Sequence, residues 1–141
     1  MEARITLVTL GVVDLARARA FYADGLGWTV SPASTGDIVF FQLPGVVLAL
    51  HPRSALADDV GVPSAGSGFR GITLARNVRS MGEVRQALET ARAAGATIVK
   101  PAQEAVWGGY SGYFADPDGH LWEIAWNPHL PLTEQGGLAL R

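Results

Sequence analysis

The chain has 141 residues, a net charge of −2 at pH 7 and no cysteine, with 48% hydrophobic and 17% charged residues. This length suits one globular domain with a full core. The lack of cysteine excludes disulfides, thiolate metal sites and cysteine nucleophiles, and the small charge gives no basis for binding nucleic acid or anionic membranes. No basic segment followed by a long apolar run opens the chain. We therefore expect a cytoplasmic protein without a signal peptide.

The first half of the chain predicts a βαβββ module over about residues 4–52. Residues 4–13 are β-branched and apolar, which is typical of a buried strand. Asp14 then caps a helix that extends to about residue 24, where glycines end it. Three strands are expected to follow, at residues 28–30, 38–43 and 46–51.

The second half repeats this order over about residues 69–127, after a connector at about residues 53–68 that contains at most one helical turn. Residues 69–75 are expected to form a strand. Ser80 and Glu83 have the spacing of a capping box at the start of an amphipathic helix. A strand at residues 97–100 and a hairpin over residues 110–126 complete the module, and a tail of residues 128–141 follows.

The hairpin over residues 110–126 carries an unusually placed charge. Its turn, Asp116-Pro117-Asp118-Gly119, combines a proline that fixes φ with a glycine that accepts positive φ. Side chains alternate along a strand, so Trp122 and Ile124 share one face of the second arm and Glu123 lies on the other. A carboxylate on a largely apolar face costs free energy unless it is paired, coordinated or hydrated. Glu123 is therefore the first candidate functional residue.

The two modules can be aligned from internal sequence alone. Two dipeptide matches define the alignment: Thr9-Leu10 with Thr73-Leu74, and Pro44-Gly45 with Asp118-Gly119. On this register Leu7 corresponds to Gly71, and Ala49 corresponds to Glu123.

Two βαβββ modules in a chain of this length resemble the vicinal oxygen chelate superfamily, which contains glyoxalase I, extradiol dioxygenases, and bleomycin- and fosfomycin-resistance proteins. The most specific motifs are residues 10–15 leading into Phe21-Tyr22, and the 116–119 turn followed by Glu123. Residues 107–113 also resemble a glyoxalase-like bacterial branch. The resemblance implies a single α+β domain in which both modules form a curved mixed sheet around a cavity, and it implies a homodimer.

The metal enzymes of this superfamily place one metal ligand on the first and last strand of each module. The resemblance puts these positions at Leu7, Ala49, Gly71 and Glu123, the same four that the internal alignment selects. Only Glu123 has a side chain that binds metals, whereas a catalytic divalent ion needs about three protein ligands. His51 shares a strand face with Ala49 and is the one further candidate. We therefore expect no cofactor, with a weakly held divalent metal as the alternative.

The favoured function is binding of a small apolar or aromatic molecule in a metal-free cavity, by sequestration as in bleomycin-resistance-type proteins. An aromatic wall at Trp107 and Tyr110 would complete the cavity, although both side chains, and Tyr113 even more so, also suit simple packing. The residues expected to contact the ligand are Leu7, Thr9, Ala49, His51, Gly71, Thr73, Trp107, Tyr110 and Glu123.

The competing function is an enzyme of the lyase, isomerase or dioxygenase type. Such an enzyme would either depend on a metal or use Glu123 as a catalytic acid or base, since desolvation raises the pKa of a carboxyl group in an apolar cavity. Two alternatives without function also remain open. In the first alternative, bulky neighbouring side chains fill the expected cavity. In the second, Glu123 has a purely structural role and is held by hydrogen bonds or by an arginine such as Arg4 or Arg70. The leucine-containing tail is expected to dock on a neighbouring subunit or to be disordered.

Overall fold

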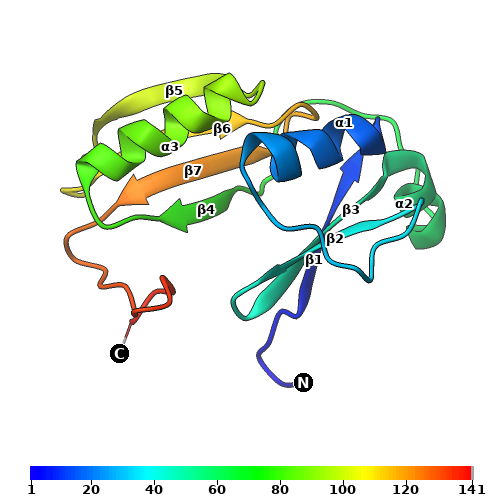
Figure 1. The fold of residues 1–141 in the computed structure, drawn as a ribbon, viewed down its shortest axis with the longest axis horizontal. Helices are drawn as coiled ribbons and strands as arrows, with labels where there is room; N and C mark the ends of the chain where they lie inside the picture. The colour runs from blue at the N-terminus through cyan, green and yellow to red at the C-terminus, as the bar shows by residue number, and fades with distance from the viewer. Residues whose placement is uncertain (141) are drawn as a thin grey trace. The chain divides into compact units, whose positions relative to one another are not determined.

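The structure, a computed structural model, describes residues 1–140. It divides into two compact units, residues 1–70 (unit 1) and residues 71 onward (unit 2). Unit 1 contains a three-stranded sheet of order β1-β3-β2, and unit 2 contains a four-stranded sheet of order β4-β7-β6-β5 (Figure 1). The α+β class is confirmed. The strands form two sheets, neither closed into a barrel.

Unit 1 follows the predicted order except at its second strand. Its elements are β1 (Leu7–Val12), α1 (Leu15–Ala20), a π-helical turn η1 (Phe21–Gly25), β2 (Val39–Leu43), β3 (Val46–Pro52) and α2 (Arg53–Val60). Asp14 caps α1 as expected, because its carboxylate accepts a hydrogen bond from the Arg17 amide at 2.9 Å. The strand expected at residues 28–30 is reduced to a single bridge between Val30 and Phe41.

The sheet of unit 1 has one face packed against α1, and the opposite face carries the predicted site residues, with α2 against its Gly11 end. Phe21 and Tyr22 are buried, and the Tyr22 ring lies 6.0 Å from that of Phe41, which confirms the two aromatics as core. Alternation places the other set of side chains on the opposite side, which we call the Leu7 face. The Leu7 face consists of Leu7, Thr9 and Gly11 of β1, Val47, Ala49 and His51 of β3, and Phe40 and Gln42 of β2.

Unit 2 forms the predicted βαβββ module. Its elements are β4 (Leu74–Asn77), α3 (Met81–Ala93), β5 (Thr97–Glu104), β6 (Tyr110–Ala115) and β7 (Leu121–Trp126). The capping box is confirmed, since Ser80 Oγ accepts from the Glu83 amide at 3.2 Å and the Glu83 carboxylate accepts from the Arg79 amide at 2.7 Å. The strand expected from residue 69 begins only at Leu74.

Helix α3 covers one face of the four-stranded sheet (Figure 1). Trp122 and Ile124 of β7 are buried on this side, and the Trp122 ring stacks with that of Phe114 at 6.2 Å. The helix approaches so closely that a Cβ added to Gly112 would lie 2.5 Å from Leu88 Cδ1. Alternation leaves Glu123 on the opposite side, which we call the Glu123 face.

The turn before β7 has the predicted chemistry. Asp116 is buried, and its Oδ1 atom accepts hydrogen bonds from the amides of Asp118 and His120, both at 2.9 Å. Gly119 has a φ of +83°, a conformation that glycine adopts without strain. The turn therefore fixes the register of β6 against β7.

The tail after β7 forms a small hairpin, with a bridge between Leu132 and Leu138. Arg79, which precedes α3, donates from Nη2 to the carbonyl oxygen of Thr133 at 2.6 Å. The tail is thus tied to the residue before α3 through Thr133, and docking on a neighbouring subunit stays a prediction. Within residues 1–140, no helix has the length and apolar character that crossing a bilayer requires.

Candidate functional site

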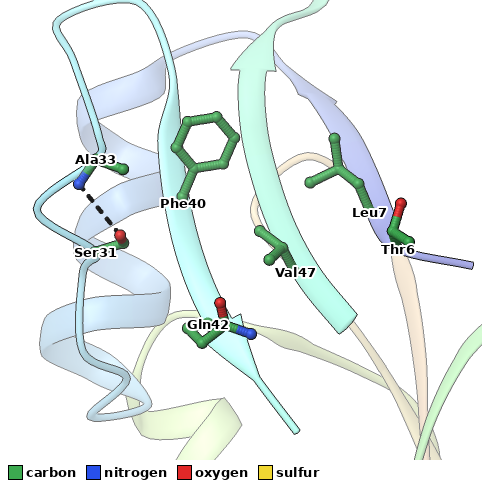
Figure 2. A pocket seen from close by; sticks show the side chains of 7 residues that line it. All are labelled: Thr6, Leu7, Ser31, Ala33, Phe40, Gln42 and Val47. Atoms are coloured by element: carbon green, nitrogen blue, oxygen red, sulfur yellow. Dashed lines mark hydrogen bonds between the residues drawn. The ribbon is translucent and has the colours of Figure 1, made fainter. Parts of the chain in front are cut away.

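A pocket of about 300 Å³ opens on the Leu7 face of unit 1. Figure 2 shows side chains from all three strands and from the segment before β2 directed around this pocket. The lining residues are Thr6, Leu7, Ser31, Ala33, Phe40, Gln42 and Val47. Leu7 is therefore the predicted site residue that the structure places directly in a pocket.

The strand register explains why these residues meet. Val47 of the central strand β3 pairs with Leu7 on one side and with Gln42 on the other, so the three side chains form one row across the sheet. The segment beside β2 closes the end of the row. Ser31 donates its amide hydrogen to the Phe40 carbonyl at 2.8 Å, and its hydroxyl accepts from the Ala33 amide at 3.2 Å (Figure 2).

The lining is mainly apolar and carries no charged side chain. Leu7, Phe40 and Val47 provide most of the hydrophobic surface. Gln42 already donates from Nε2 to the Leu43 carbonyl at 3.0 Å, so its own side-chain oxygen is the acceptor it offers to a ligand. The pocket can therefore hold an uncharged molecule and orient it with a small number of polar contacts.

The other predicted residues of unit 1 lie further along the same face. Thr9 pairs with Ala49, which is fully buried, in the row next to the pocket. His51 lies one row beyond, and its Nδ1 atom is 2.8 Å from the Asp37 carbonyl oxygen. A carbonyl only accepts hydrogen bonds, so Nδ1 is the donor in this contact.

In unit 2, Glu123 is paired with a tyrosine on the Glu123 face. Tyr113 of β6 lies directly opposite Glu123 of β7 in the antiparallel register, and their side chains are hydrogen-bonded. On the other side, Glu123 pairs with Ala75 of β4. Alanine offers no polar side-chain group, so Tyr113 is the polar neighbour of Glu123 on the paired strands β4 and β6.

Burial raises the pKa of Tyr113, and the negative charge of Glu123 and the hydrogen bond between them raise it further. The phenol is therefore neutral and donates to the carboxylate. Such a pair can orient a polar ligand atom or transfer a proton.

Sequence reasoning favoured simple packing for Tyr113 and expected Tyr110 in an aromatic wall of the cavity. Tyr110 lies on the α3 side of the sheet, where its ring is 5.5 Å from the guanidinium carbon of Arg85. It does not join an aromatic wall beside Glu123. The signal for Tyr113 was present, since counting outward from the 116–119 turn places residue 113 opposite residue 123.

Three further predicted residues lie outside the strands. Gly71 and Thr73 come before β4 and are exposed, and Gly71 has a φ of +74° that no strand residue adopts. Trp107 is in the turn between β5 and β6, with 42% of its surface exposed. The structure gives these three residues no place in either the unit 1 pocket or the Tyr113–Glu123 pair.

The donor set does not fit the metal site of the superfamily's metal enzymes. Leu7, Ala49 and Gly71 offer no side-chain donor, which leaves Glu123 as the single ligand among the four positions. Across residues 1–140, no three His, Cys, Asp or Glu side chains gather closely enough to hold an ion.

Two modules of this kind, each with one sheet face under a helix and one carrying polar or pocket residues, define a glyoxalase-like fold. The sequence profile of the Glyoxalase/Bleomycin resistance protein/Dioxygenase superfamily matches residues 4–124, and the chain belongs to this superfamily. A comparison with curated proteins gave no match.

Solved structures extend the comparison. A glyoxalase-related enzyme from Fulvimarina pelagi is 39% identical, with a TM-score of 0.90 over 99% of each chain. A glyoxalase/bleomycin resistance protein/dioxygenase from Nocardioides is 30% identical, with a TM-score of 0.73 over 89% of this chain and 84% of the other. Lactoylglutathione lyase from Agrobacterium tumefaciens, at 23% identity and a TM-score of 0.66 over 89% and 95%, shares the fold.

Proposed function

We propose that the protein binds a small, uncharged, largely apolar or aromatic molecule in the pocket of unit 1. The observation that carries this proposal is the uncharged lining of a cavity of about 300 Å³, with Leu7, Phe40 and Val47 as its apolar walls. That volume lies at the lower end of the range for small-molecule sites. Leu7 also occupies a position where the metal enzymes of the superfamily carry a ligand. An apolar side chain there supports sequestration without a metal.

The test is a titration with 4-methylphenol, which is uncharged at neutral pH, followed by NMR of the backbone amides. We expect shifts centred on residues 31–33, 40–42 and 47. Val47→Trp fills the pocket and should abolish these shifts. Val99→Trp is the matched control, because Val99 is an exposed strand valine outside the pocket, and it should leave binding unchanged.

Two results would overturn the proposal. One is binding of the probe that survives Val47→Trp. The other is the absence of binding by any member of a panel of neutral aromatic molecules, together with the absence of a co-purified small molecule in native mass spectrometry.

A second candidate function is metal-independent acid–base catalysis at the Tyr113–Glu123 pair. It is supported by the hydrogen-bonded pairing of a carboxylate with a phenol whose pKa is raised, and by the 39% identical Fulvimarina pelagi protein, which is described as an enzyme. In this reaction the Glu123 carboxylate accepts a proton from a carbon beside a carbonyl group. As Glu123 takes that proton, the single O–H of Tyr113 turns from the carboxylate and donates a hydrogen bond to the resulting enolate oxygen.

Hydrogen–deuterium exchange into hydroxyacetone in D₂O tests the enzyme proposal without knowledge of the natural substrate. Catalysed exchange that is lost in Glu123→Gln, with a smaller loss in Tyr113→Phe, would support it. A purely sequestering protein would give no exchange above buffer. Exchange that persists in Glu123→Gln would exclude Glu123 as the base.

A further inference from the structure

A second cavity in unit 1, of about 260 Å³, lies beside helix α2 rather than at the pocket described above. Its walls come from one stripe of α2 and from the chain that returns along the helix. The lining includes Arg53, Leu56, Ala57 and Val60 of α2, with Val62 and Ser64 of the returning segment. The four helical residues follow the i, i+3, i+4, i+7 spacing, so they share one face of α2.

The cavity is held in shape by the way α2 ends. Gly61 adopts a left-handed conformation with φ +82° and donates to the Ala57 carbonyl at 2.8 Å. The Val62 amide donates to the same carbonyl at 3.0 Å, so the chain turns back on the helix. At the other end, Arg53 Nε donates to the Ser64 carbonyl at 2.7 Å. The returning segment is thus fastened at both ends of α2.

Arg53 is positioned as a binding group by two contacts. Its aliphatic stem lies against Gly11 of β1, where an added Cβ would be 3.3 Å from Arg53 Cα and 3.4 Å from Arg53 Cβ. Its Nε is engaged by the Ser64 carbonyl, which fixes the plane of the guanidinium. The two terminal nitrogens, which form the fork that matches a carboxylate, are not used by this bond.

The charges around the cavity favour a single negative group. Arg53 is the one charged residue in the lining. The acidic residues of α2, Asp58 and Asp59, fall outside the stripe that carries Arg53, Ala57 and Val60 and are exposed. A doubly charged phosphate would require more cationic partners than one guanidinium.

We infer that this cavity binds a small carboxylate with an apolar body, such as a monocyclic aromatic or short-chain aliphatic acid. The carboxylate lies on the terminal nitrogens of Arg53, and the apolar body lies against Leu56, Val60 and Val62. The volume, below the roughly 300 Å³ at which pockets for drug-sized ligands begin, sets the size class. This site takes an anion, whereas the pocket at Leu7, Phe40 and Val47 takes a neutral molecule.

The experiment compares benzoate with benzamide, its uncharged counterpart of nearly equal shape, on the full native chain. Amide NMR should show benzoate shifts centred on residues 53–64 and affinity for benzamide weaker by about tenfold or more, as expected when a charge-assisted pair is lost. Arg53→Gln should weaken benzoate binding by a similar factor. Arg19→Gln, which neutralises an exposed arginine on α1 of the same unit, should not.

The inference fails if benzamide binds as well as benzoate, if benzoate binding survives Arg53→Gln, or if the native chain binds no benzoate. It also fails if the benzoate shifts centre on residues 40–47, because that result would place the acid in the pocket assigned to neutral molecules. The benzoate–benzamide comparison needs no variant, so it stands even if Arg53→Gln does not fold. Different amides report on the two cavities. A negative result with benzoate therefore does not decide whether the pocket at Leu7, Phe40 and Val47 binds a neutral molecule.

Discussion

At the scale of single residues, Glu123 affects the protonation of Tyr113. Burial, the charge of Glu123 and their hydrogen bond all raise the pKa of Tyr113. Glu123→Gln removes the charge, so the pKa of Tyr113 should fall toward its ordinary value of about 10. Tyrosinate absorbance during an alkaline titration measures this, with Tyr113→Phe identifying which part of the signal belongs to Tyr113. An unchanged titration in Glu123→Gln would contradict the pairing.

The raised pKa of Tyr113 also makes the free energy of unfolding depend on pH. The folded protein holds the Tyr113 proton more tightly than the unfolded chain does. The contribution of Tyr113 to the free energy of unfolding is therefore fully present below about pH 10, and it is lost as pH rises through the raised pKa of the folded state. Tyr113→Phe should therefore lose less stability between neutral and strongly alkaline pH than the native chain does. Denaturant unfolding at a series of pH values provides the comparison.

Gly112 shows how tightly one residue position can be constrained. Besides Leu88, an added Cβ would meet the Lys100 carbonyl oxygen at 2.9 Å and the Ala102 amide nitrogen at 3.0 Å. Backbone atoms cannot move aside as a side chain can, so Gly112→Ala should destabilise unit 2 by about 1–3 kcal/mol. Gly36→Ala is the control, since nothing lies within 4 Å of its added Cβ and its φ is not positive. Equal unfolding midpoints for the two variants would refute this reading.

The site residues were only partly predictable from the sequence, because side-chain alternation can be read from it whereas the backbone conformation of individual glycines cannot. The alternation rule placed Glu123 on the face away from Trp122 correctly, and applied across the turn it would have found Tyr113. Gly71 and Thr73 were assigned to a strand expected over residues 69–75. The conformation of the neighbouring glycines, which sequence alone does not give, removes them from it.

At the scale of elements, helix α3 depends on its cap. Ser80 Oγ satisfies the Glu83 amide, and Glu83 in turn satisfies the amide of Arg79. Ser80→Ala should cost about 0.5–2 kcal/mol in the free energy of unfolding. Ser54→Ala is the comparison, because Ser54 is exposed within α2 and caps nothing, and it should have little effect. A Ser80→Ala variant as stable as Ser54→Ala would show that the cap contributes nothing measurable.

Most helices and strands could be predicted from the sequence because the residues that determine where they begin and end are close together in the chain. The α1 and α3 caps and the 116–119 turn each depend on residues within five positions of one another. The strand expected from residue 69 failed because Gly68 and Gly71 both have positive φ, at +87° and +74°, which interrupts extended backbone. Phe69 and Ile72 are consequently exposed, at 71% and 61%, although both are large apolar residues. The connector was richer in structure than expected, because α2 extends from Arg53 to Val60.

At the scale of the whole molecule, we expect stability to be independent of divalent metal. Three of the four positions that the superfamily's metal enzymes use for ligands are Leu7, Ala49 and Gly71. Exhaustive treatment with EDTA, followed by addition of Zn²⁺ or Ni²⁺, should leave the thermal midpoint unchanged, since a bound ion would raise it by mass action. Stoichiometric metal in protein purified without chelator, lost in Glu123→Ala, would reverse this conclusion. The homodimer stays a prediction that sedimentation equilibrium can decide.

The Arg79 side chain should protect the C-terminal hairpin from proteolysis. Arg79 Nη2 donates a hydrogen bond to the Thr133 carbonyl oxygen at 2.6 Å, and the Arg79 backbone amide donates to the Glu83 carboxylate. Arg79→Ala keeps the amide and the capped helix but releases the hairpin. Limited digestion should therefore trim the variant after residue 126 sooner than the native chain, with α3 left intact. Mass spectrometry of the fragments would follow the trimming directly, and equal rates of cleavage would show that other contacts hold the end in place.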